Sequence, residues 1–177
     1  MATDYQSIEE FAIPQAITEN STKQLNPLGT IIRARDAGST DLGTGEFIYL
    51  PGVASNAVGL ANNFIRASWA TALVDTDAAA TIIGAVAIAM SASVASEWGW
   101  YQIGGIALVK TLDSVAINKP LFPSATAGQL EDISLASGAP ESILQGCVTV
   151  EANDGAGAGL QYTYAYINRP VIAGVVI

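Results

Sequence analysis

The fold is decided by the stretch Trp98-Gly99-Trp100-Tyr101-Gln102-Ile103-Gly104-Gly105-Ile106-Ala107-Leu108-Val109-Lys110. Apolar and aromatic residues on both sides of the glycine pair predict two strand segments, and the pair itself predicts a bulge or a tight bend between them. Because the side chains of a strand alternate between its faces, Trp98, Trp100 and Gln102 are expected to share one face.

Short strands are predicted on both sides of this stretch, at residues 30–34, 46–50, 63–69, 82–90, 115–117, 145–151 and 160–167. The last two form the clearest hairpin, joined by a glycine-rich connection. Strands at this spacing, with 17 Gly and 7 Pro between them, predict a mainly β body. We expect a single antiparallel β-barrel or β-sandwich, with helix only in short pieces near Glu9 and at residues 55–62.

Residues 1–28 differ from the rest of the chain, because they combine a short helix-like piece with prolines and a polar run. A helix this short is marginal in water. We therefore expect an extended N-terminal arm that packs against a neighbouring subunit, with a floppy terminus as the alternative. The arm is favoured because Phe11, Ile13 and Ile17 would otherwise have nothing to pack against. The predicted organisation is an arm at residues 1–28 and a β-rich body at residues 29–177.

The composition excludes several classes of function. The 177 residues are enough for one domain. Charged residues make up 13% of the chain and the net charge is −9, so nucleic acids and anionic membranes are not expected partners. Without histidine there is no Ser-His-Asp triad, and the single Cys147 cannot form an internal disulfide or a multi-thiolate site. We expect no catalytic residue, no metal and no cofactor.

Two uncharged stretches need a structural explanation. Residues 78–96 are close to the ~20 residues that span a bilayer. They are mostly Ala and Ser, however, and acidic rather than basic residues flank them, which favours a buried strand at residues 82–90 over a membrane span. The apolar tail at residues 171–177 is expected to pair with a sheet, because a free apolar edge strand promotes aggregation.

The chain contains no catalytic or nucleotide-binding motif of sufficient specificity. Gly43-Thr44-Gly45 lacks the third glycine of a dinucleotide loop, and neither a P-loop nor a nucleophile elbow is present. The glycine-rich residues 151–159 lack the ligand spacing of a calcium loop. A glycosidase with paired carboxylates is the least favoured alternative, because nothing in the sequence places two carboxylates across a cleft.

The aromatic residues offer two interpretations. Tyr162, Tyr164 and Tyr166 share one face of a predicted strand, and aromatic faces stack well on the apolar surfaces of sugars. The same residues are common in cores and subunit interfaces. The alternative function is therefore a β-rich carbohydrate-binding or adhesive module, which we rank below a role in assembly.

The order of several short motifs resembles a known family. They are Leu28-Gly29-Thr30-Ile31-Ile32, Gly43-Thr44-Gly45-Glu46-Phe47-Ile48-Tyr49-Leu50-Pro51-Gly52-Val53-Ala54, Gly84-Ala85-Val86-Ala87, Trp98-Gly99-Trp100-Tyr101-Gln102-Ile103-Gly104-Gly105 and Gly128-Gln129-Leu130. In style and order, across about residues 28–170, they resemble the capsid decoration (cement) proteins of tailed bacteriophages.

This resemblance implies a non-enzymatic structural protein of the virion, located on the outer capsid surface. It would bind the major capsid protein, associate with copies of itself as a homotrimer, and stabilise the shell by bridging neighbouring capsid subunits. The low charge fits this role, because large exposed apolar areas on a protein are normally covered by partners. The candidate contact residues are Phe11, Ile13, Pro14, Trp98, Trp100 and Tyr101.

Overall fold

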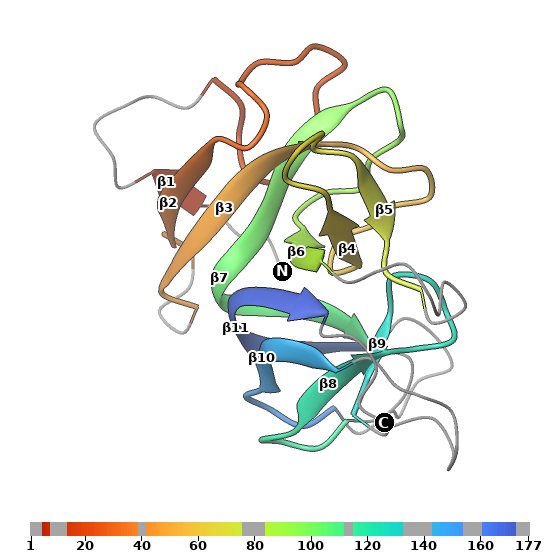
Figure 1. Ribbon diagram of the computed structural model, residues 1–177. Helices are drawn as coiled ribbons and strands as arrows, with labels where there is room; N and C mark the ends of the chain where they lie inside the picture. Colours follow the sequence, from red (N-terminus) through yellow and green to blue (C-terminus); the bar gives the residue numbers. More distant parts are fainter. Residues whose placement is uncertain are drawn as a thin grey trace.

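The computed structural model describes residues 5–7, 14–38, 42–75, 84–111, 115–132, 143–153 and 161–172. The strands in these residues (Figure 1) are β1 (Tyr5–Ser7), β2 (Ile31–Asp36), β3 (Thr44–Pro51), β4 (Ala61–Phe64), β5 (Thr71–Leu73), β6 (Gly84–Ala89), β7 (Trp98–Thr111), β8 (Pro120–Pro123), β9 (Leu130–Glu131), β10 (Leu144–Thr149) and β11 (Gln161–Ile172). They form one sheet in the order β1-β2-β3-β7-β9-β8-β10-β11-β6-β4-β5, and β7 also pairs with β11 and with β6. The pairing of β7 with β9 is parallel.

The prediction of a mainly β fold is confirmed. The described strands belong to one large sheet, and no closed barrel is assigned within these residues. The short helical piece predicted at residues 55–62 is wrong, because these residues form turns and then enter β4. The backbone N–H of Ala61 donates to the carbonyl oxygen of Gly128 at 2.8 Å, so its partner is far away in sequence. Glu9, the other predicted helical position, lies outside the described residues.

Strand β7 lies at the centre of the sheet (Figure 1). It changes partner at the glycine pair. Its N-terminal half pairs with β3 and β6, and its C-terminal half pairs with β11 from Gly104 to Thr111. The register with β3 shifts by one residue, since Glu46 is opposite Gly104 and Phe47 is opposite Gln102. This confirms the bulge predicted from the glycine pair.

In the residues that the structure describes, the core has three clusters that meet along β7. The C-terminal half of β7 faces a cluster shared with β6, β8, β9, β10 and β11. The N-terminal half is covered on both faces: Tyr101 and Ile103 belong to one cluster, while Trp100 packs with Tyr49 and Ile17 in the other. Both faces of β7 are therefore buried at Trp100 and Tyr101.

The extended arm predicted at residues 1–28 is corrected by the structure. Residues 5–7 form strand β1, which pairs with β2. Ile17 is 1% exposed in the core, and Gln15 donates from Nε2 to the carbonyl oxygen of Trp98 at 2.9 Å. The hydroxyl group of Tyr49 donates to Gln15 Oε1 at 2.7 Å. In the described part, this segment thus packs on its own subunit, because a long-range polar network and one buried isoleucine attach it to β3 and β7.

Three other predictions concern the uncharged stretches and the hairpin. The predicted buried strand at 82–90 corresponds to β6, whose residues from Val86 to Ala89 are buried. The predicted hairpin is confirmed as β10–β11. The tail pairs with β6 through Val171 and Ile172, and residues 173–177 lie outside the described part. In the residues that the structure describes, no helix is long and apolar enough to cross a bilayer.

Candidate functional site

Trp100, one of the candidate contact residues, lies in the core. Its side chain is 1% exposed, and its ring meets the ring of Tyr49 edge-on, with centroids 5.0 Å apart and planes at 63°. The indole Nε1–H donates to the carbonyl oxygen of Gln15 at 3.2 Å. The structure therefore leaves Trp100 no exposed surface to offer a partner.

Tyr101 is buried on the opposite face of β7 and is 2% exposed. Its hydroxyl group donates to the carbonyl oxygen of Pro51 at 3.2 Å and accepts from Asn56 Nδ2 at 3.1 Å. Burial raises the pKa of this phenol, and hydrogen bonds with Ser93 and Asn56 act in the opposite direction. The neutral hydroxyl group is thus a fixed part of a buried polar network.

The other candidate contact residues are distributed differently. Pro14 is exposed and Trp98 is half-buried, and Trp98 forms a bridge with Ser21 of the N-terminal segment. Phe11 and Ile13 lie outside the described residues. The four candidate residues that the structure describes therefore do not form one exposed surface, because Trp100 and Tyr101 are buried.

An apolar surface is instead exposed on β7, β10 and β11. We call it the tyrosine face, and its residues are Tyr162, Tyr164, Tyr166, Ile106, Leu108, Val148 and Val150. The strand register builds it, because Tyr166 is opposite both Ile106 and Val148, and directly opposed residues point to the same side. Tyr166 is 52% exposed and Val148 is 41% exposed.

The opposite side of the same strands is fully buried. Thr163, Ala165 and Ile167 are each 0% exposed, so β11 alternates between core and surface as its sequence predicted. The sequence analysis placed the three tyrosines together but missed the aliphatic residues beside them. The signal was available in the hairpin, because its register brings Val148 and Val150 next to the tyrosines.

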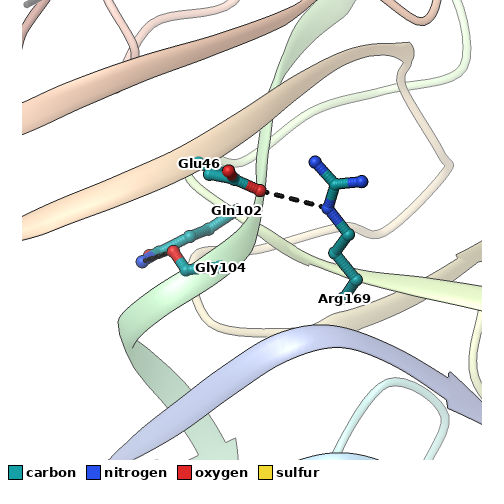
Figure 2. A network of polar contacts seen from close by, with 4 residues as sticks. All are labelled: Glu46, Gln102, Gly104 and Arg169. Atoms are coloured by element: carbon teal, nitrogen blue, oxygen red, sulfur yellow. Dashed lines mark hydrogen bonds and ion pairs between the residues drawn. The ribbon is translucent and has the colours of Figure 1, made fainter.

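A polar groove of about 370 Å³ lies next to the tyrosine face and shares Tyr166 with it. Its other lining residues are Arg33, Thr44, Gly45, Glu46, Gly104, Gly105, Ile167, Asn168 and Arg169. Arg169 Nε donates to Glu46 Oε2 at 3.1 Å across the groove (Figure 2). Below this ion pair, Gln102 Nε2 donates to the carbonyl oxygens of Gly104 at 3.0 Å and Ile106 at 2.9 Å, which fixes the bend of β7.

Known proteins provide no guide to these surfaces. No family model, curated protein or solved structure matches the chain. Any assignment of function therefore depends on the geometry and chemistry of the tyrosine face and the polar groove.

In the described residues, no group of three or more acidic or thiol side chains is placed to hold a metal ion.

Cys147 faces the core and is 1% exposed. Burial raises the pKa of its thiol from the usual 9.0 to about 12. Below pH 9 the thiol is protonated in the folded and unfolded states alike, so the stabilisation is complete there. Between pH 9 and about 12 the unfolded state loses this proton first, so this group's contribution to stability falls as the pH rises.

We therefore predict that Cys147 resists alkylation in the folded protein. At pH 8, modification by iodoacetamide should be at least ~100-fold slower than in guanidinium chloride, because the thiol is both buried and protonated. Mass spectrometry of timed samples measures both rates on the same single thiol. Equal rates in the two solvents would show that Cys147 is accessible in the native state.

Proposed function

We propose that this chain is a structural virion protein that binds the outer surface of a tailed-phage capsid and stabilises the shell by bridging neighbouring capsid subunits, without catalytic activity. The observation that carries the proposal is the tyrosine face, an apolar surface on paired strands. Isolated exposed apolar residues are ordinary, but a contiguous group of them on a soluble protein indicates an interaction surface.

The composition of the tyrosine face supports a protein partner. Tyrosine is enriched and charged residues are depleted at the centres of protein interfaces. Charged residues make up only 13% of the whole chain, against about 25% in typical soluble domains. A chain with so little charge is easier to understand if part of its surface is covered in the assembly.

Stabilisation of a shell requires binding and no catalysed reaction. A subunit that binds only the closed shell lowers its free energy by an amount set by affinity and free concentration. Many copies on one particle, each with a modest interface of about 1,600 Å², add up to a large resistance to disassembly. We propose the major capsid protein and further copies of this chain, as a homotrimer, for the partners.

The proposed contact surface differs from the one expected from sequence. Trp100 and Tyr101 are buried in the subunit, so the tyrosine face replaces them as the proposed contact. Pro14 remains a candidate because it is exposed, and Phe11 and Ile13 remain predictions.

We predict that Tyr166→Ala weakens attachment to capsids at least tenfold, because exposed aromatic anchors contribute most at the centre of an interface. The measurement is the number of copies per particle, determined by quantitative mass spectrometry of particles banded on a density gradient. The matched control is Val94→Ala. It removes an apolar side chain that is also 52% exposed but lies in a loop outside the tyrosine face. Attachment of Tyr166→Ala at full strength would contradict the proposed contact surface, and failure of the unaltered chain to band with particles would contradict the proposed function.

A second candidate function is carbohydrate binding by the same surface, favoured by the 52% exposure of Tyr166. An exposed tyrosine ring can stack on the apolar face of a sugar. Saturable glycan binding by a stable monomer, lost in Tyr166→Ala, would favour this function. Self-association or attachment to particles, without glycan binding, would favour the capsid proposal.

A further inference from the structure

The polar groove gathers positive charge in an acidic protein. Arg33 of β2 and Arg169 of β11 line it, and they are two of only seven Lys and Arg residues in a chain of net charge −9. Among the described residues that line the groove, Glu46 is the one acidic side chain, so together they carry a net charge of +1. The charge of the groove is thus opposite in sign to that of the whole chain.

Arg169 has unused hydrogen-bonding capacity. Its ion pair joins Nε to a single oxygen of Glu46 (Figure 2). The Arg169 side chain is 55% exposed. A guanidinium group has five N–H donors, and this contact occupies one of them. Among the described residues, the Arg169 side chain makes no other hydrogen bond.

The backbone around the groove is held in an uncommon conformation. Arg169 has φ 43° and Gly105 has φ 95°, both in the left-handed region. For a residue with a β-carbon this conformation costs free energy and is enriched at functional sites. Gly146 on β10, at φ 77°, packs so closely that a β-carbon there would lie 2.8 Å from the carbonyl oxygen of Asn168. The irregular part of β11 at residues 168–169 is therefore held by close contact with β10, and Arg169 pairs with Glu46 from there.

We propose that the polar groove binds the carboxylate of an Asp or Glu side chain of the capsid subunit, with Arg169 and Arg33 as its cationic partners. The net charge of +1 matches a monoanion better than a phosphate dianion, and guanidinium groups pair with carboxylates in two-bond geometry. Thr44 and Asn168 supply polar groups at the rim.

The choice of a capsid side chain as the occupant rests on the proposed function. Tyr166 belongs to both surfaces, so a partner that covers the tyrosine face would extend directly over the groove. The tyrosine face would then supply apolar contact area, while the groove would fix the register of the partner by one charged pair.

The first test uses the isolated protein and needs no capsid. The probes are two acetylated and amidated tripeptides, Ala-Glu-Ala and Ala-Gln-Ala, and the measurement is a titration followed by NMR of the arginine Nε–H and backbone amide signals. We expect saturable shifts at Arg169, Gly104 and Gly105 with the glutamate peptide, and at least tenfold weaker binding of the glutamine peptide. Equal binding of the two peptides, or no saturable shift with either, would overturn the proposal.

Variants assign the binding to the groove. Arg169→Gln and Arg33→Gln should each weaken binding of the glutamate peptide at least fivefold, because each removes a charge-assisted partner. Lys23→Gln removes one positive charge from an exposed residue outside the groove and should leave the affinity within twofold. Unchanged binding in Arg169→Gln, or an equal loss in Lys23→Gln, would overturn the proposal. Sodium glutarate tests whether the groove prefers a free dicarboxylate to a protein side chain. If it binds at least tenfold more tightly than the glutamate peptide, the assignment of an Asp or Glu side chain to the groove is wrong.

Particle binding separates this inference from the proposed function. If Arg169→Gln attaches to capsids at full strength while Tyr166→Ala does not, the groove proposal fails and the proposed function stands. If the unaltered chain does not attach to particles at all, the proposed function fails, and the assignment of a capsid side chain fails with it. Reduced attachment of both variants supports the groove and the face together.

Discussion

Trp100→Ala is expected to lower the free energy of unfolding by about 3–5 kcal/mol, the usual cost of removing a fully buried large aromatic side chain. Trp100 is 1% exposed, packs edge-on against Tyr49 at a centroid distance of 5.0 Å, and donates to the carbonyl oxygen of Gln15. The alanine variant loses the apolar contacts and leaves that carbonyl oxygen without this donor. Because small domains are stable by only about 5–15 kcal/mol, this variant should be close to the limit of folding.

Guanidinium denaturation followed by far-UV circular dichroism measures this effect. Tyr166→Ala is the matched control, since it also removes an aromatic ring, but from a side chain that is 52% exposed. We expect the control to change the free energy of unfolding by less than about 1 kcal/mol. A stable Trp100→Ala protein that fails to bind capsids would instead place Trp100 at the interface, as the sequence predicted.

Gly105→Ala is expected to lower the free energy of unfolding by about 2–5 kcal/mol. The backbone of Gly105 has φ 95°, and a β-carbon there would lie 2.6 Å from the carbonyl oxygen of Thr44. The left-handed conformation costs a residue with a β-carbon about 1–2 kcal/mol, and the overlap with a neighbouring strand's backbone adds about 1–3 kcal/mol. The carbonyl group cannot move away cheaply, because β3 is paired with β2 at this position.

Gly43→Ala separates the two causes. Gly43 has φ 63°, but a β-carbon there would meet no atom within 4 Å. The control variant should therefore lose only the conformational contribution, about 1–2 kcal/mol. Thermal and chemical denaturation of the two variants give the difference, and equal losses of stability would show that the close approach of β3 to Gly105 has no energetic importance.

The sequence predicts those features of the fold whose causes are local. The glycine pair interrupts an apolar run, and the bulge beside it, between Gln102 and Gly104, involves residues that are neighbours in the chain. The alternation in β11 is equally local, so the shared face of the three tyrosines could be predicted. The position of the N-terminal segment could not, because Ile17 and Gln15 reach their partners on β3 and β7 only in the folded chain.

The location of the aromatic residues shows the same limit. Strand periodicity tells which side chains share a face, but it does not tell what covers that face. Trp100 and Tyr101 point to opposite sides of β7, and separate clusters cover each side. The polar groove has no local signal either, because Glu46 and Arg169 are 123 residues apart in the sequence.

The pairing of β7 with β11 also constrains when the protein can fold. Residues 104–111 of β7 pair along their length with residues 161–168 of β11, and β6 pairs with residues 171 and 172. A nascent chain therefore leaves residues 104–111 of β7 without their β11 partner until residue 168 has left the ribosome. Such distant pairings also slow folding, typically to milliseconds or seconds. Because synthesis starts at the N-terminus, β7 is made before β11. Strand β11, which pairs with the C-terminal half of β7, is the last of the described strands to be made.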